Sequence, residues 1–307
     1  MHHASVAVIG EALVDEFHDG PVAGGAPFNV ARSLAGLGTP TLFISRIAAD
    51  DANGSLVLES ARRYGLDCID LQRDGLRDTG RVSVIEHASG GHRFEIHGDA
   101  AWDHIDAATA LDALHARPAQ FAYFGTLAQR LAPSRAAVRA LMKTFPGPRL
   151  LDLNLRGSPG MQQLAAESLM LADWLKVNND ELAQLATWFD LPMDSEAATV
   201  IALMARFALQ RVVLTRGPQG WRLYGGGPVL EGAGEPQAHL VDTVGAGDAF
   251  TAMLLAGLAL ARELPGTLKL ANQYASFICG LRGPLPADAN AITPWRNALH
   301  SLPRCAP

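Results

Sequence analysis

Leu240-Val241-Asp242-Thr243-Val244-Gly245-Ala246-Gly247-Asp248-Ala249-Phe250 leads from a strand-like run into a helix. Gly245 and Gly247 allow backbone angles that most residues cannot reach, and they keep side chains away from the amides of the turn. The residues after Asp248 are apolar on nearly every side through Leu258, which predicts a central, buried helix. Because free N–H groups at a helix start attract anions, this turn predicts an anion site.

Asp248 lies in the first turn of that predicted helix, where a carboxylate can simply complement the helix dipole. A carboxylate beside an anion site would also repel phosphate, unless it accepts a proton from an attacking hydroxyl. Phosphoryl transfer needs this combination of a base, an alcohol and donors for the developing charge. The turn is not a Walker A loop, because no Gly-Lys-Ser/Thr follows, and it is not a Gly-x-Gly-x-x-Gly dinucleotide loop.

Short apolar runs alternate with helical patterns along most of the chain. The predicted strands are residues 6–10, 41–45, 121–124, 150–153, 174–177 and 212–215. The predicted helices between them are residues 29–37, 55–64, 135–143, 161–171, 181–188 and 196–209. This order predicts right-handed βαβ units in a three-layer α/β/α sandwich with a mostly parallel central sheet, formed by one domain over residues 1–307.

Residues 79–96 interrupt this alternation, because two strand-like arms flank Ala88-Ser89-Gly90-Gly91 and predict a β-hairpin. The stretch after Gly10 predicts a further strand. A small sheet built from about residues 11–23 and 77–104 could form a lid over a site. The alternative left open by the pattern is an antiparallel edge of the main sheet.

The composition excludes several classes of function. Of the 307 residues, 49% are hydrophobic and 18% are charged, and the net charge of −6 argues against a nucleic-acid surface. The three cysteines are far apart, so no zinc or disulfide framework is expected. The first residues do not have the pattern of a secretory signal, and the most apolar window, 250–261, is too short to span a bilayer. We therefore expect a cytoplasmic protein without membrane or nucleic-acid partners.

Two motifs resemble the signatures of the PfkB (ribokinase-like) carbohydrate kinases. Gly24-Gly25-Ala26-Pro27-Phe28-Asn29-Val30-Ala31 is similar to the N-terminal signature, and residues 242–250 are similar to the C-terminal one. The resemblance runs in matching order from Gly10 to Gly283. It implies ATP and Mg²⁺ as cofactors, Asp248 as the base, and amides of Gly245, Ala246 and Gly247 that stabilise the developing charge.

On the sugar side, the resemblance implies contacts from residues in three parts of the chain. The implied substrate-binding residues are Glu11, Asp15, Gly24, Gly25 and Asn29, with Asn29 as a plain helix cap in the alternative interpretation. Phe94 and Trp102 either line the sugar pocket or pack the lid. Arg156, in Asp152-Leu153-Asn154-Leu155-Arg156, is implied to lie near the transferring phosphate or the substrate, or else to form a surface ion pair.

On the nucleotide side, the resemblance implies a cofactor-binding set made of Asn178, Thr215, Gly217, Gly220 and Asn272. Glu181 completes an Asn-x-x-Glu spacing and is implied to bind Mg²⁺, either directly or through a water molecule. Asp242 and Thr243 match a loop that can hold a monovalent cation, usually K⁺. One departure is Ala49, which stands where many members have a glycine.

The resemblance implies an ATP-dependent sugar kinase that is fructokinase-like, with a primary hydroxyl of fructose as the first choice of acceptor. The alternatives are ribose, a nucleoside or a 2-keto-3-deoxy sugar acid. A catalytically silent sugar-binding protein on the same fold is a further alternative. An exposed lid sheet would also make a homodimer through the lid feasible.

Overall fold

The computed structural model describes residues 5–18, 20–86, 92–155, 160–235 and 240–305, with the side chains of 86 and 92–94 left aside. Within these ranges an eight-stranded sheet has the order β14-β13-β12-β11-β10-β9-β1-β4. Its strands are β1 (Val6–Ile9), β4 (Thr41–Ile44), β9 (Phe121–Gly125), β10 (Arg149–Asp152), β11 (Trp174–Asn178), β12 (Arg211–Thr215), β13 (Trp221–Tyr224) and β14 (Leu230–Gly232). The strands from β4 to β12 run parallel, and β13 and β14 are antiparallel additions.

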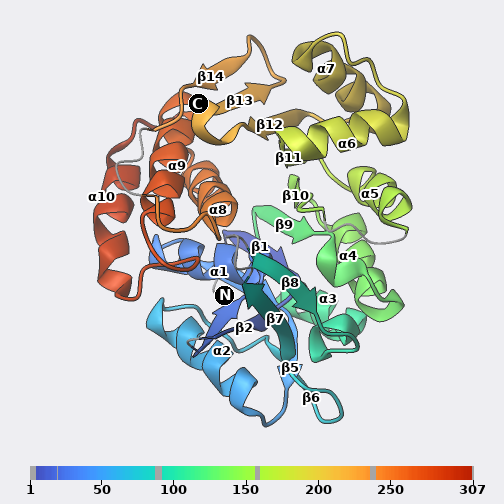
Figure 1. Ribbon diagram of the computed structural model, residues 1–307, viewed down its shortest axis with the longest axis vertical. Helices are drawn as coiled ribbons and strands as arrows, with labels where there is room; N and C mark the ends of the chain where they lie inside the picture. The colour runs from blue at the N-terminus through green and yellow to red at the C-terminus, as the bar shows by residue number, and fades with distance from the viewer. Residues whose placement is uncertain (1–4, 19, 87–91, 156–159, 236–239, 306–307) are drawn as a thin grey trace.

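Helices cover both faces of this sheet, as Figure 1 shows. One face packs on α1 (Ala26–Gly36), α2 (Ala52–Arg63), α8 (Ala246–Ala259), α9 (Leu264–Cys279) and α10 (Thr293–Ser301). The other packs on α3 (Ala107–Ala116), α4 (Ala132–Thr144), α5 (Met161–Leu169), α6 (Asn179–Phe189) and α7 (Glu196–Phe207). Because side chains alternate along a strand, Val6 and Val8 enter the first core while Ala7 and Ile9 enter the second.

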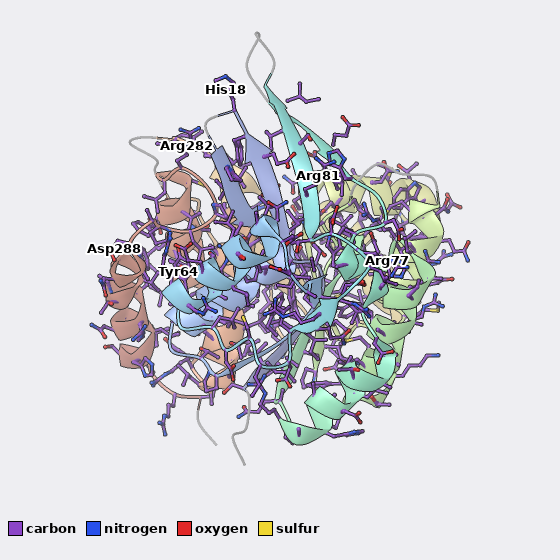
Figure 2. All side chains as sticks on the ribbon, turned by 90° about the horizontal axis from the view of Figure 1, so that it is seen from below. His18, Tyr64, Arg77, Arg81, Arg282 and Asp288 are labelled. Carbon is purple, nitrogen blue, oxygen red and sulfur yellow. The ribbon has the colours of Figure 1, made fainter. Side chains whose placement is uncertain are left out.

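A second, four-stranded sheet has the order β3-β2-β7-β8. Its strands are β2 (Leu13–Phe17), β3 (Gly20–Gly24), β7 (Gly80–Glu86) and β8 (His92–Ile96). Figure 2 shows it standing off the α/β body, with His18 just past the end of β2 and Arg81 on β7. The hairpin at residues 79–96 therefore does not form an edge of the main sheet, which was the alternative. The turn residues 88–91 lie outside the described residues.

The predicted fold class is confirmed, since a mostly parallel sheet lies between helices and a small sheet accompanies it. Each of the six predicted strands is present within a residue or two. The helix α3 and the antiparallel pair β13–β14 were not predicted. Two further strands, β5 (Arg46–Ala48) and β6 (Gln72–Asp74), form a short parallel pair. Among the helices that the structure describes, none has the length and apolar character required to cross a membrane.

The topology brings polar residues to one edge of the main sheet. The carboxyl ends of β1, β10, β11 and β12 meet there, since parallel strands all end on the same side. The helices α1 and α8, from opposite ends of the chain, pack against each other beside this edge. Ligands of α/β sheets bind outside the carboxyl ends of the strands, so a ligand site is expected at this edge.

Candidate active site

A cavity of about 890 Å³ lies along this sheet edge. It is large enough for two small ligands side by side, since typical ligand pockets have about 300–1,000 Å³. Its wall combines Glu11, just after β1, and residues from β2, β7, β8, β10, β11 and β12 with the first turn of α8 and one side of α9. The cavity thus connects the two halves of the site that the sequence predicts.

The glycine-rich turn forms part of the cavity wall. Gly245 has φ +80° and precedes α8, and a Cβ there would lie 2.5 Å from Cα of Pro284. The amide of Ala246 donates to the carbonyl of Thr243 at 3.3 Å, so it is partly engaged already. The helix itself supplies no partner for the amides of Gly247 and Asp248. These two N–H groups are therefore the strongest candidates for anion binding.

The carboxylate of Asp248 is held by a neighbour on α1. Asn29 Nδ2 donates to Asp248 Oδ2 at 2.8 Å. Asn29 does not cap α1, because the helix begins after Gly25 and Asn29 lies in its second turn. The amide thus faces the cavity beside the carboxylate, where both can reach the same ligand atom.

Arg32 holds Asn29 in turn, and sequence reasoning missed it. Its guanidinium donates to Asn29 Oδ1, to Ser60 Oγ and, at 2.9 Å, to the carbonyl of Ala23, and the residue is only 3% exposed. Burial lowers the pKa of Arg32 to about 10, although nearby Tyr64 and Asp248 act in the opposite direction. The guanidinium is therefore charged at neutral pH. It fixes which end of the Asn29 amide points at Asp248.

Glu11, Asp15, Gly25 and Asn29 line the end of the cavity under the small sheet. Gly24 lies behind this wall, and a Cβ on it would come within 2.2 Å of Asp15 Oδ2. A Cβ on Gly25 would lie 2.8 Å from the carbonyl oxygen of Glu11. The two glycines therefore let the start of α1 pass close to both acidic residues. Four apolar side chains that were not predicted complete this end: Leu13, Val82, Ile96 and Leu127.

A buried ion pair lies beside the glycine-rich turn. Lys176 Nζ is 3.0 Å from each carboxylate oxygen of Asp152, and Thr251 Oγ1 donates to Asp152 Oδ2 at 3.1 Å. Both partners line the cavity. Neither was predicted as a site residue. The available signals were the place of Lys176 near the end of β11 and the place of Asp152 at the end of β10, where it begins the Asp152–Arg156 motif.

Glu181 begins α6 in a reciprocal cap with Asn178. Its Oε2 accepts the amide of Asn178 at 2.9 Å, its Oε1 accepts that of Leu155 at 3.0 Å, and Asn178 Oδ1 accepts the amide of Glu181 at 2.9 Å. Burial raises the pKa of Glu181, and the ammonium of Lys176 opposes this. Because its oxygens already serve backbone amides, Glu181 is suited to touch a metal through water rather than to enclose it.

The donor set as a whole fits Mg²⁺ and does not form a protein cage for it. Within the described parts of the chain, no three His, Cys, Asp or Glu side chains converge as a metal cluster. Mg²⁺ keeps several waters and takes most other ligands from substrate phosphates, with one or two carboxylates nearby. Glu181, on the cavity wall, meets that requirement.

The predicted nucleotide residues gather at the far end of the same cavity. Its wall there includes Asn178, Thr215, Gly217, Gly220 and Asn272. Asn272, on α9, donates to the carbonyl of Ala233 at 3.1 Å and so fixes the segment after β14. Thr243 also lines the cavity, whereas the carboxylate of Asp242 accepts the amide of Val244 at 3.0 Å and is not part of the wall.

The comparisons with known proteins match this arrangement. Residues 7–289 match the family model described as pfkB family carbohydrate kinase. The chain belongs to this family. The pfkB assignment confirms the resemblance seen in the two signatures and identifies the chain as a sugar kinase of that family.

Individual relatives of this pfkB kinase are moderately similar. It is 29% identical over 312 residues to a fructokinase of Klebsiella pneumoniae, covering 97% of this chain and 98% of that one. An uncharacterized sugar kinase from Pyrococcus horikoshii superposes with a TM-score of 0.79 at 26% identity, over 96% and 100% of the chains. A fructokinase from Vibrio cholerae O395, in a form with fructose, ADP and calcium, gives 0.77 at 25% identity over 92% and 95%.

Trp102 requires a correction, because the structure of this pfkB kinase places it outside the cavity wall. The side chain is fully buried with Leu13, Val82 and Ala128, and the guanidinium of Arg130 stacks 4.1 Å from its ring centre. Trp102 lies in a short 3-10 helix, Ala101–His104, beneath the small sheet. It therefore packs the base of that sheet, the alternative that the sequence left open. The side chain of Phe94 and all of Arg156 lie outside the described residues.

Proposed function

We propose that this pfkB kinase transfers the γ-phosphate of ATP to a primary hydroxyl of a monosaccharide, and that fructose is the acceptor. One observation carries the proposal: Asp248, oriented by Asn29, lines the same cavity as Asp15, on β2 of the small sheet, and Thr215, at the end of β12. A base between two ligand sites is what an in-line transfer requires.

In the proposed reaction, Asp248 accepts the proton as the acceptor oxygen attacks the γ-phosphorus. The new P–O bond forms while the bond to the β,γ-bridging oxygen breaks, and ADP leaves with that electron pair. The amides of Gly247 and Asp248, at the positive end of α8, stabilise the charge on the moving group. Mg²⁺ would neutralise phosphate oxygens near Glu181.

The chemistry of the sugar end supports a neutral acceptor. The residues there are Glu11, Asp15 and Asn29, which bind hydroxyl groups well, and apolar side chains such as Leu13 and Ile96. Among the wall residues that the structure describes, Lys176 is the one basic side chain, and it lies at the glycine-rich turn. A sugar acid or sugar phosphate would need a cation at the sugar end. Arg156, which lies outside the described residues, is the candidate for that cation, so ribose, a nucleoside and a 2-keto-3-deoxy sugar acid remain the alternatives.

Fructose is favoured within this class by the relatives. The Klebsiella pneumoniae relative is named fructokinase, and the Vibrio cholerae structure contains fructose and ADP. Both align with nearly the whole chain. We also propose that a monovalent cation binds near Thr243, and that the small sheet acts as a lid, since Val82 and Ile96 face the cavity from β7 and β8.

The test is an assay of ADP formation with ATP, Mg²⁺ and a panel of neutral sugars, nucleosides and sugar acids. We expect turnover with fructose to exceed that with every other acceptor. If ribose or a nucleoside is phosphorylated faster than fructose, the proposed acceptor is wrong but the proposed kinase activity stands. Tight sugar binding without ADP formation would support the silent sugar-binding protein instead. Repeating the assay with Na⁺ in place of K⁺ tests the cation.

A further inference from the structure

Lys176 lies against the first turn of α8. It is on the same face of β11 as Trp174, toward the core that α8 fills. A Cβ added to Gly247 would lie 3.0 Å from Lys176 Nζ, so the ammonium sits directly beside the backbone of the anion site. The side chain is 9% exposed, and what is exposed faces the cavity.

The side chain of Lys176 stays protonated in its buried position. Burial alone would lower the pKa of this ammonium, but Asp152 and Glu181 outweigh the effect and raise the pKa above its ordinary value of 10.5. Lys176 is therefore cationic throughout the pH range in which a kinase works. Asp152 holds Nζ with both oxygens, and Thr251 holds Asp152, so the position of the charge is fixed before any ligand arrives.

An ammonium has three N–H donors, and the two contacts with Asp152 leave capacity for one more. Pairing with Asp152 does not by itself explain a lysine at this place, because a buried ion pair can often be replaced by apolar residues without loss of stability. An anionic group that enters the cavity also meets the carboxylates of Asp248 and Glu181. A fixed cation beside the amides at the start of α8 offsets that repulsion.

We propose that Lys176 Nζ donates a hydrogen bond to a non-bridging oxygen of the γ-phosphoryl group as it moves from ATP to the acceptor. This inference rests on the proposed kinase function. It makes Lys176 a catalytic residue that joins the amides of Gly247 and Asp248 in one anion site. The contact is preorganised by Asp152 and strengthens as charge develops on the transferring group.

The experiment compares Lys176→Met with wild type and with Lys143→Met as a matched control. Loss of one preorganised donor typically lowers kcat about 100- to 1,000-fold, and we expect this for Lys176→Met. Lys143→Met makes the same substitution at an exposed lysine in the last turn of α4, so its kcat should stay within about threefold of wild type. A kcat for Lys176→Met within tenfold of wild type would overturn the proposal.

Binding measurements separate this role from a structural one. In calorimetry, Lys176→Met should bind ATP more weakly than wild type does, and also ADP together with aluminium fluoride. Its affinity for ADP alone should equal that of wild type. Equal losses for ATP and ADP would overturn the proposal. Should Lys176→Met fail to fold, the neutral pair Asp152→Asn with Lys176→Gln replaces it, with the same expected results. If the wild-type protein phosphorylates no sugar, the proposed function is wrong. The comparison of ATP and ADP binding would still test the role of Lys176.

Discussion

Asn29 and Asp248 are 219 positions apart in the sequence, yet Asn29 Nδ2 lies 2.8 Å from Asp248 Oδ2. This hydrogen bond joins the N-terminal and C-terminal signatures in one site. It also holds one carboxylate oxygen of Asp248 against the Asn29 amide on the cavity wall. The relationship makes the role of Asp248 open to a direct test.

Asp248→Asn should abolish most of the activity and preserve the fold. An amide cannot accept the proton of the acceptor hydroxyl, and loss of a general base typically lowers kcat about 100- to 10,000-fold. Steady-state kinetics and thermal melting measure the two effects. Asp180→Asn is the matched control, because Asp180 is an exposed carboxylate in the first turn of α6. If Asp248→Asn keeps nearly full activity, Asp248 is not the catalytic base.

Arg32→Met should reduce both stability and turnover. The substitution leaves Asn29 Oδ1, Ser60 Oγ and the Ala23 carbonyl without their buried donor, and we expect a loss of roughly 3 kcal/mol in the free energy of unfolding. Urea denaturation measures this loss. Turnover should fall as well, since the Asn29 amide is then free to rotate away from Asp248.

Arg63→Met is the control for Arg32, because Arg63 is half-exposed on α2 and pairs with Glu59 one turn away. Its effect on stability should stay within about 0.5 kcal/mol. If Arg32→Met and Arg63→Met behave alike in both assays, the buried guanidinium does not orient the catalytic pair.

Glu181 should make stability depend on pH in a defined direction. Burial raises its pKa above the ordinary value of 4.5. A carboxyl with a higher pKa in the folded chain stabilises the fold in its protonated form. That contribution is complete below pH 4.5 and is lost as the pH rises through the folded pKa. Glu181→Gln cannot ionise, so its stability relative to wild type should rise as the pH increases above about 4.5. Denaturation curves at a series of pH values without Mg²⁺ measure this, and a relative stability that falls over the same interval would contradict it.

Cys279 offers a test of the nucleotide position. It lines the cavity on α9 near Asn272, and burial raises the pKa of its thiol. Cys305 is exposed, and burial raises the pKa of Cys68 to about 11. With iodoacetamide at mildly alkaline pH, ADP should protect Cys279 while Cys305 reacts at an unchanged rate and Cys68 reacts slowly. Peptide mass spectrometry follows each thiol, and labelling of Cys279 that ignores ADP would place the nucleotide elsewhere.

The strands of the main sheet and the glycine-rich turn could be predicted from the sequence because they follow from local patterns. Apolar runs identified six strands, and glycine spacing identified the turn before α8. The same information could not reveal Arg32, which stands in α1 where a charged residue would ordinarily face solvent. Lys176 was hidden for a similar reason, since its position in β11 becomes meaningful only when Asp152 lies beside it. Trp102 shows the reverse case: an aromatic residue close to the site in sequence is separated from it by the base of the small sheet.

The pairing of α1 with α8 also has a consequence for how the protein is made. A ribosome releases Asn29 early in synthesis and Asp248 only when about four-fifths of the chain has been translated. Incomplete chains that end before α8 therefore carry Asn29 without the carboxylate it binds, and they cannot consume ATP by the proposed route. The same separation suits a split protein, in which two inactive fragments regain activity only when they are brought together.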